Sequence, residues 1–246
     1  MSAPIVNASV PPLVVWDVDG TLVDSRRSIT TAMDTAFTAH GLPAPGYERT
    51  RKIVGLSLEV ACEQLAPADA SPALVDKIVE SYKAAFVAQR EEQGFTEPLF
   101  EGALETLEQL SAAGWLQAVA TGKARRGLMK VFERHPIGEH FFSVHTACEG
   151  HGKPHPRMVL EAMAAAGAEP AQTVVVGDTS HDVLMARNAG ARAFGVAWGF
   201  HEPGEILAAG AHELHEDFAS LGAGLERFAA ARGFGGAHSD DQGDAA

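Results

Sequence analysis

Cysteine and long apolar runs are both scarce in this chain of 246 residues. Its two cysteines, Cys62 and Cys148, are too few for a disulfide framework and too far apart for a zinc-binding spacing. The apolar runs last only a few residues, whereas a helix that crosses a bilayer needs about 20. The segment 1–12 has neither the basic nor the apolar region of a secretory signal. We therefore expect a cytoplasmic protein with reduced thiols and no membrane partner.

Positive charge is also in short supply, because 19 Lys and Arg stand against 32 Asp and Glu, which gives a net charge of −13. Nucleic acids need clustered Lys and Arg, and the sequence has no basic stripe, so no nucleic-acid partner is expected. The same charge repels small anions, so a site for one needs its own cations. With 46% hydrophobic and 21% charged residues, the composition is that of a folded globular protein.

Short apolar runs that end at a polar cluster containing glycine predict strands buried on both faces. These runs are Leu13–Trp16, Leu116–Ala120, Thr173–Val176 and Ala193–Trp198. Helical patterns that stop at glycine lie between them, over 102–113, 156–166 and 180–189, and the second has Pro156 at its first position. This alternation predicts an α/β fold with a doubly wound parallel sheet.

The interval between the first two predicted strands is far longer than one crossover requires. Apolar stripes at helical spacing predict three helices within it, at 25–40, near 58–65 and from Ser71 toward Gly94. We therefore predict a core made of residues 1–23 and 99–232, with an inserted helical domain at 24–98. The Gly-rich, acidic segment 233–246 is expected to be disordered.

Acidic and hydroxyl side chains follow three of the predicted strands, namely Asp17 and Asp19, then Thr121, then Asp178. Taken singly, each cluster is equally typical of a plain turn or a helix cap. In open parallel sheets, however, ligands bind beyond the carboxyl ends of the strands. Alternation along an extended chain places Asp17 and Asp19 on one side, and paired carboxylates suit Mg²⁺ together with a substrate phosphate.

Four ordered segments resemble the motifs of haloacid dehalogenase-like hydrolases. They are Asp17-Val18-Asp19-Gly20-Thr21, then Thr121, then Lys153 in His151-Gly152-Lys153-Pro154, and finally Gly177-Asp178-Thr179-Ser180-His181-Asp182. The resemblance covers roughly Val14 to Gly199, and the helical insertion lies where this family places a C1-type cap. It implies a Rossmann-like core and, within the family, similarity to phosphoglycolate phosphatases.

The resemblance implies a role for each motif residue. Asp17 would be the nucleophile that forms an aspartyl-phosphate, and Asp19 would act as general acid and then as base. The hydroxyl of Thr121 and the amide of Gly122 would bind a phosphoryl oxygen, while Lys153 would neutralise developing charge. Family members often carry Asn where this chain has Gly122, so one side-chain contact to the substrate is missing.

The resemblance also implies a Mg²⁺ site. Asp17, Asp178 and the main-chain carbonyl of Asp19 would hold the ion, while Asp182 would act through a metal-bound water or would orient Lys153. Lys123, at a predicted helix start, either meets an anion or is solvated. His212 and His215 are expected at the solvated surface.

Val54-Gly55-Leu56-Ser57 resembles the family's substrate-specificity loop, although an ordinary turn between helices explains it nearly as well. In the first reading, Gly55 and Ser57 bind the substrate, and Arg51 just before them meets a carboxylate. That set of contacts would suit 2-phosphoglycolate. We expect the partner to be a small phosphorylated metabolite and the chain to be a monomer or a homodimer.

Several other functions remain open at this point. A sugar-phosphate mutase and a pyrophosphatase use the same motifs, whereas a dehalogenase is disfavoured because it lacks the acid that Asp19 supplies. A phosphonate hydrolase would require Lys52 to form a Schiff base. Outside enzymes, a receiver-like signalling domain orders its Asp, Thr and Lys differently, and a phosphate-binding protein would not need every reactive group.

Overall fold

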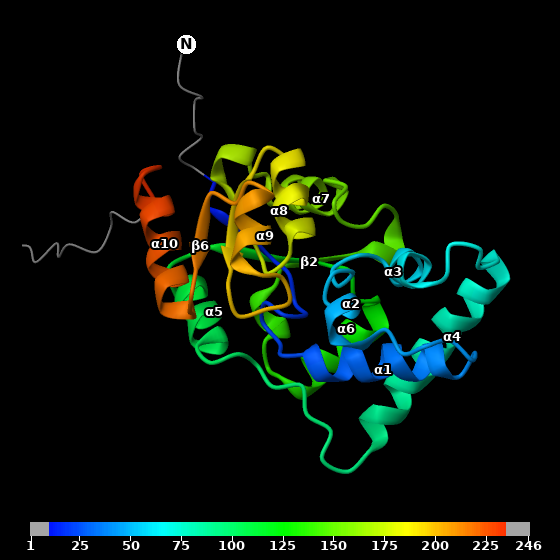
Figure 1. Cartoon of the computed structure of the whole chain (residues 1–246). Coiled ribbons are helices and arrows are strands. Elements are labelled where there is room, and N and C mark those ends of the chain that lie inside the picture. Colours follow the sequence, from blue (N-terminus) through cyan, green and yellow to red (C-terminus); the bar gives the residue numbers. More distant parts are fainter. Residues whose placement is uncertain (1–9, 235–246) are drawn as a thin grey trace, which may run out of the picture.

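A computed structural model describes residues 10–234 and shows a parallel sheet between two layers of helices, with further helices at one edge (Figure 1). Within that range the sheet has the strand order β3-β2-β1-β4-β5-β6, and every neighbouring pair is parallel. The strands are β1 Leu13–Trp16, β2 Leu116–Thr121, β3 Ser143–Thr146, β4 Thr173–Gly177, β5 Arg192–Val196 and β6 Glu213–His215. The predicted α/β fold with a doubly wound sheet is therefore confirmed.

Alternating side chains of the buried strands pack against different helix layers. Val14 and Trp16 of β1 face one hydrophobic cluster, whereas Leu13 and Val15 face the other. The first layer contains α5 Ala103–Ala112, α6 Arg125–Arg134 and α10 Phe218–Ala230. The second contains α7 Arg157–Ala166, α8 Ser180–Asn188 and α9 Pro203–Ala208. Short 3₁₀ turns lie at Gly138–His140, Ala147–Glu149 and Pro170–Gln172.

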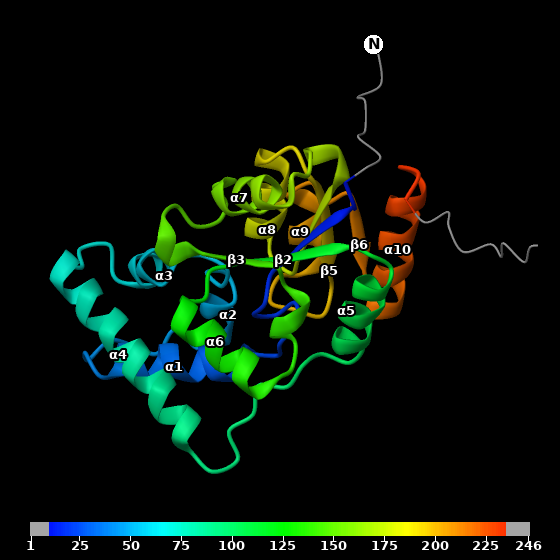
Figure 2. The same cartoon turned by 180° about the vertical axis from the view of Figure 1, so that it is seen from behind.

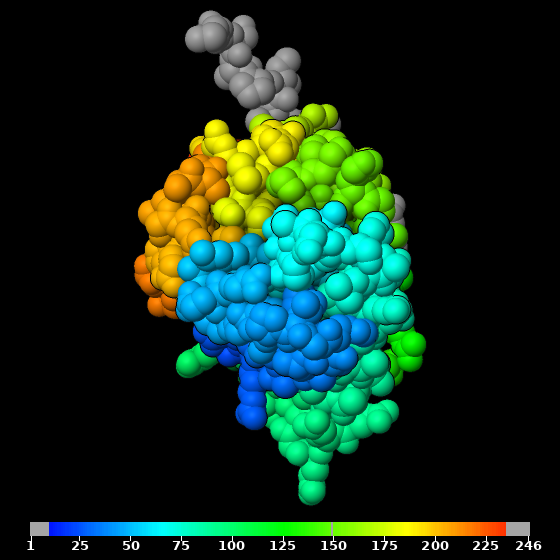
Figure 3. Space-filling model, turned by 45° about the vertical axis from the view of Figure 1, so that its right-hand side comes forward, coloured from blue at the N-terminus to red at the C-terminus, as the bar shows by residue number. Residues whose placement is uncertain are grey.

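Further helices lie between β1 and α5, and we call this segment, residues 24–98, the cap. They are α1 Arg26–Thr38, α2 Gly46–Thr50, α3 Leu58–Leu65 and α4 Pro72–Glu91, and Figure 2 shows α4 crossing in front of α1. The apolar stripes seen in the sequence face one another, with Met33 and Phe37 of α1 packed in one cluster with Ile78 and Phe86 of α4. The cap helices thus share one hydrophobic cluster, which also includes Phe200 from the loop after β5. In Figure 3 the blue and cyan surface of the cap lies directly against the rest of the molecule.

Three local predictions are wrong. β5 ends at Val196 rather than Trp198. The indole Nε1 of Trp198 donates to the carbonyl oxygen of Thr21 at 3.0 Å, and this tertiary contact holds Trp198 outside the strand. Pro156 occupies the N-cap of α7, which begins at Arg157. His215, expected at the solvated surface, is buried on β6 with its ring centroid 5.2 Å from that of Phe194. The sequence could not predict this burial, because a strand of three residues gives no periodic signal.

The predicted disordered segment 233–246 falls almost wholly outside the described residues, which include only Gly233 and Phe234 of it. Among residues 10–234, no helix combines the length and the apolar character needed to cross a membrane.

Candidate active site

The sheet topology brings the predicted acidic residues together. β1 and β4 are neighbours at the centre of the sheet, and the chain fills the sheet in opposite directions on either side of them. Trp16 pairs with Val176, and the amide of Asp17 donates to the carbonyl oxygen of Val176 at 2.9 Å. Asp17 and Asp178 therefore lie side by side at the carboxyl edge, at the topological switch point where ligands bind in such folds.

Three buried carboxylates lie close together, and two of them contact one buried ammonium group. Asp17, Asp178 and Asp182 each place an oxygen within 4.8 Å of the other two, and all three residues are buried. Nζ of Lys153 lies 2.7 Å from Oδ1 of Asp17 and 2.6 Å from Oδ1 of Asp182. The second oxygen of Asp182 accepts from the hydroxyl of Thr179 at 2.6 Å. Asp182 is therefore fixed by the start of α8 and in turn orients Lys153 toward Asp17.

Asp178 is held by two donors that the sequence motifs alone do not assign. The hydroxyl of Thr21 donates to its Oδ1 at 2.8 Å, and the amide of Phe200 donates to its Oδ2 at 2.8 Å. Gly20 has φ +88°, and a Cβ there would lie 2.3 Å from Oδ2 of Asp178. The glycine in the first motif thus meets both a backbone requirement and a need for close approach to this carboxylate.

The positive charge of Lys153 is too small to balance the buried carboxylates around it, and their pKa values are raised. Burial raises the pKa of Asp17 to about 7, with added repulsion from Asp182 and Asp19, although Lys153 opposes the change. Burial and the charges of Asp17 and Asp182 raise the pKa of Asp178 well above its ordinary value. Burial by itself would lower the pKa of Lys153, but its two carboxylate partners outweigh burial and raise it.

These residues fit a divalent cation with oxygen ligands. Oδ2 of Asp17 is buried and accepts a hydrogen bond from no residue within 10–234. With all four carboxylates ionised, Asp19 included, they would face only the two ammonium groups of Lys153 and Lys123, and two negative charges would lack compensation. Asp17 and Asp178 are thus suited to hold Mg²⁺, which takes few carboxylates and keeps room for a phosphate. The side chain of Asp19 lies outside the cluster, so its expected metal contact would be through the main chain.

Lys123 is the site residue that the sequence left undecided. Its Nζ lies 2.7 Å and 2.9 Å from the two carboxylate oxygens of Asp19, and both side chains are largely buried. The backbone amide of Lys123 donates to the hydroxyl oxygen of Thr121 at 3.1 Å, which ties the end of β2 to the same place. Of the two alternatives that the sequence left open, Lys123 meets an anion, and that anion is Asp19.

The cap reaches the site through the loop that contains Gly55. A Cβ on Gly122 would lie 2.7 Å from the carbonyl oxygen of Gly55 and 2.6 Å from that of Leu56. Gly55 itself has φ +93°, and a Cβ there would lie 3.2 Å from the hydroxyl oxygen of Thr179 and 3.8 Å from Cδ of Lys153. Glycine at 122 therefore lets the cap backbone pack directly against the second motif, in space that an Asn side chain would fill.

Two other cap residues predicted to contact the substrate, Arg51 and Ser57, have partners within the protein. Nη1 of Arg51 lies 2.7 Å from Glu205 and its Nε lies 3.1 Å from Glu48, so these ion pairs would have to be exchanged before Arg51 could meet a substrate carboxylate. Nothing near Arg51 in sequence reveals its distant partner on α9. Ser57 is the N-cap of α3, and its hydroxyl oxygen accepts from the amide of Val60 at 3.5 Å.

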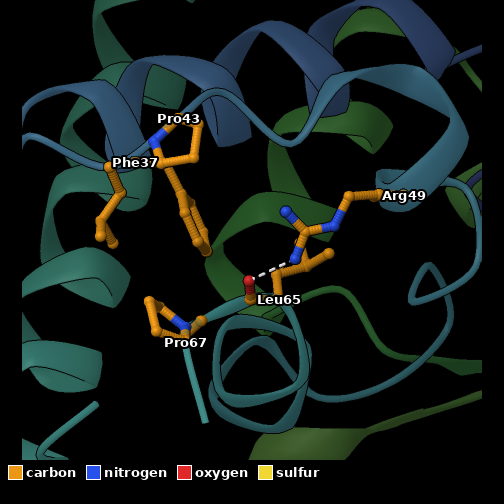
Figure 4. A pocket seen from close by; sticks show the side chains of 7 residues that line it. Phe37, Pro43, Arg49, Leu65 and Pro67 are labelled. Carbon is orange, nitrogen blue, oxygen red and sulfur yellow. Dashed lines mark hydrogen bonds between the residues drawn. The ribbon is translucent and has the colours of Figure 1, made fainter. Parts of the chain in front are cut away.

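A hollow of about 130 Å³ lies within the cap rather than at the acidic cluster (Figure 4). Figure 4 shows Arg49 reaching across it to donate to the carbonyl oxygen of Leu65, at 2.6 Å. Its lining residues are Phe37, Leu42, Pro43, Arg49, Leu65, Ala66 and Pro67. None of them belongs to the motifs, so this hollow is not part of the candidate site.

Known proteins with the same arrangement identify the family. Residues 14–196 match the family model described as "Haloacid dehalogenase-like hydrolase". A Dickeya dadantii protein named "Probable phosphatase IndB" is 36% identical over 211 residues, which cover 85% of this chain and 91% of that protein. "Phosphoglycolate phosphatase 1" of Pseudomonas aeruginosa is 30% identical over 201 residues, covering 80% of this chain and 74% of that protein.

Solved structures agree at the level of the fold. A hydrolase from Pseudomonas syringae has a TM-score of 0.75 at 24% identity, covering 88% of this chain and 98% of that one. A structure described as a predicted phosphatase from Clostridium acetobutylicum has a TM-score of 0.78 at 20% identity, covering 89% of this chain and all of that one. With its family match, its relatives and its four motifs gathered at one sheet edge, this chain belongs to the haloacid dehalogenase-like hydrolases.

Proposed function

We propose that the chain is a Mg²⁺-dependent phosphatase that hydrolyses a small phosphate monoester through a phosphorylated Asp17. The observation that carries this proposal is the constellation at the switch point. Asp17 lies 2.7 Å from the buried Lys153 and within 4.8 Å of Asp178 and Asp182, with Asp19 two residues further along the chain. The named phosphatases among the relatives agree with this class of reaction.

The chemistry follows from the placement of these groups. A carboxylate oxygen of Asp17 forms a bond to phosphorus while the bond from phosphorus to the leaving oxygen breaks. Lys153 and the Thr121 hydroxyl stabilise charge on the phosphoryl oxygens, and a bound Mg²⁺ would supply further positive charge there. Asp19 gives its proton to the leaving oxygen and then takes one from the water that hydrolyses the phosphorylated Asp17. Because both oxygens of Asp19 contact Lys123, that contact must be exchanged before Asp19 can carry a proton.

For the substrate, we propose 2-phosphoglycolate. Its support is the name of the Pseudomonas aeruginosa relative and the tight contact of the Gly55 loop with Gly122, which suits a small leaving group. We further propose that the protein works in the cytoplasm, which fits the absence of a disulfide between its free cysteines Cys62 and Cys148. Its oligomeric state is proposed as a monomer or a homodimer.

The test is phosphate release from a panel of phosphate monoesters and pyrophosphate, with Mg²⁺ and with EDTA. Replacing the nucleophile in Asp17→Asn should lower kcat by at least about a thousandfold on every substrate that is turned over. Asp76→Asn, which alters an exposed acid of α4, is the matched control and should retain full activity. Wild-type release that survives in Asp17→Asn would refute the nucleophile, and a marked preference for sugar phosphates or pyrophosphate would refute the substrate.

A further inference from the structure

Helix α4 presents three residues to the part of the site around Asp19. Tyr82, Phe86 and Arg90 are four residues apart, so they lie on one side of the helix. The ring centroids of Tyr82 and Phe86 are 5.7 Å apart, and the guanidinium carbon of Arg90 lies 4.7 Å from the centroid of the Phe86 ring. Nζ of Lys123, which holds Asp19, lies 5.3 Å from that same ring. This side of α4 therefore adjoins the proposed acid.

Tyr82 lies on the side of α4 that adjoins Lys123, because its ring contacts that of Phe86, over which the Lys123 ammonium lies. The Tyr82 ring packs against the hydrophobic core of the cap and is partly exposed, while its hydroxyl makes no hydrogen bond within residues 10–234. Burial raises the pKa of this hydroxyl well above its ordinary value, and the next largest contribution is the negative charge of Asp19. A partly exposed phenol hydroxyl without a partner among the described residues is a hydrogen-bonding group available to a ligand.

The other polar groups on this side differ in their availability. Oε1 of Glu97 accepts from the hydroxyl of Ser28 at 2.8 Å, and its Oε2 lies 3.6 Å from Arg90 and 3.5 Å from Arg134. Arg90 is therefore held by the link between α4 and the core. Lys123, in contrast, contacts only Asp19 and the Phe86 ring through its ammonium group among the described residues.

The position of the leaving group follows from the proposed function, on which this inference rests. Asp19 protonates the leaving oxygen, so the leaving group must lie next to Asp19 and away from the contact between Asp17 and Lys153. There it meets a cation, an aromatic ring and a phenol hydroxyl. These three groups together suit a small leaving group that carries a carboxylate.

We propose that Tyr82 determines substrate specificity by donating a hydrogen bond to a carboxylate on the leaving group, whose charge Lys123 neutralises. Arg51, which the sequence suggested for this role, is occupied by Glu205.

The experiment compares 2-phosphoglycolate with p-nitrophenyl phosphate, whose leaving group has no carboxylate, in wild type and Tyr82→Phe. Loss of one hydrogen bond to a charged group should lower kcat/KM for 2-phosphoglycolate by roughly 10- to 100-fold. The value for p-nitrophenyl phosphate should change by less than about threefold, because that ester makes no such bond. Tyr47, the only other tyrosine of the chain, is exposed, so Tyr47→Phe is the control and should leave both kcat/KM values unchanged.

Each other outcome separates this inference from the proposed function. Wild-type turnover of both esters without a selective loss in Tyr82→Phe would overturn the role of Tyr82 and leave the phosphatase standing. A wild type that hydrolyses p-nitrophenyl phosphate and not 2-phosphoglycolate would overturn the carboxylate-bearing leaving group. Release of phosphate from neither ester would overturn the proposed function, and this inference with it.

Discussion

Two lysines contact three of the four acidic residues of the site, and the two lysines lie at different places. Lys153 bridges Asp17 and Asp182 with no exposed side-chain surface, whereas Lys123 holds Asp19 at the boundary with the cap. A buried carboxylate that loses its cationic partner is strongly destabilised, so neither lysine can be exchanged for a neutral residue without cost. Each of the two lysines thus balances buried negative charge and also takes part in the proposed chemistry.

A prediction at the residue scale concerns His215, which lies outside the site. Burial lowers its pKa below the ordinary 6.5, so the unfolded chain takes up a proton at a higher pH than the folded chain does. The stability that His215 contributes is complete above pH 6.5 and is lost as the pH falls below that value. The free energy of unfolding of wild type, relative to His215→Gln, should therefore fall between pH 7.5 and 5.5, by at most about 1.4 kcal/mol per pH unit.

Urea unfolding of both proteins at the two pH values measures this difference. His151→Gln changes an exposed histidine and serves as the control. An unchanged difference between wild type and His215→Gln across this range would contradict the prediction.

At the scale of elements, the Gly55 loop of the cap packs against Gly122, at the end of β2. This contact joins backbone to backbone, and neither side has a flexible side chain that could move aside. Movement of the cap would therefore alter this contact directly.

Gly122→Ala tests this contact. The added Cβ would lie 2.6 Å from the carbonyl oxygen of Leu56, so the cap loop has to move away from the site. We expect kcat/KM to fall by about tenfold, which corresponds to about 1.4 kcal/mol, and amide exchange in residues 53–57 to become faster. Gly222→Ala in α10, where a Cβ meets nothing within 4 Å, should leave both quantities unchanged. Wild-type kinetics in Gly122→Ala would show that the loop contact does not matter.

At the scale of the whole molecule, the net charge of −13 need not exclude an anionic substrate. The buried carboxylates at the switch point form a local cation site, and that site decides which small anion can approach. The general surface charge still opposes polyanions, because their many phosphates need an extended basic surface.

Mg²⁺ should therefore stabilise the folded protein. At a concentration about 100 times its dissociation constant, a ligand that binds only the folded state adds about 2.7 kcal/mol to the free energy of unfolding. Thermal unfolding with Mg²⁺, compared with EDTA, should show a rise in Tm of several degrees, and Asp178→Asn should lose most of it. Asp76→Asn should retain the full rise, and an equal rise in Asp178→Asn would contradict this assignment of the ligands.

Sequence alone predicted the fold class, because buried strands of a parallel sheet are short continuous apolar runs and the helices between them end at glycine. It also named Asp17 and Asp178, since strand ends of a parallel sheet meet at one edge. The family resemblance named Lys153, which lies 2.7 Å from Asp17. β6 and the burial of His215 could not be predicted, because three residues carry no period.

Only the tertiary structure decided the partners of charged side chains. Arg51 binds Glu205, which is 154 positions away, and Lys123 binds Asp19, which is 104 positions away. The position of Tyr82 and Phe86 next to Lys123 likewise depends on how α4 packs against the core. Local sequence determines which element a residue joins, whereas distant pairing follows from packing, which no spacing along the chain encodes.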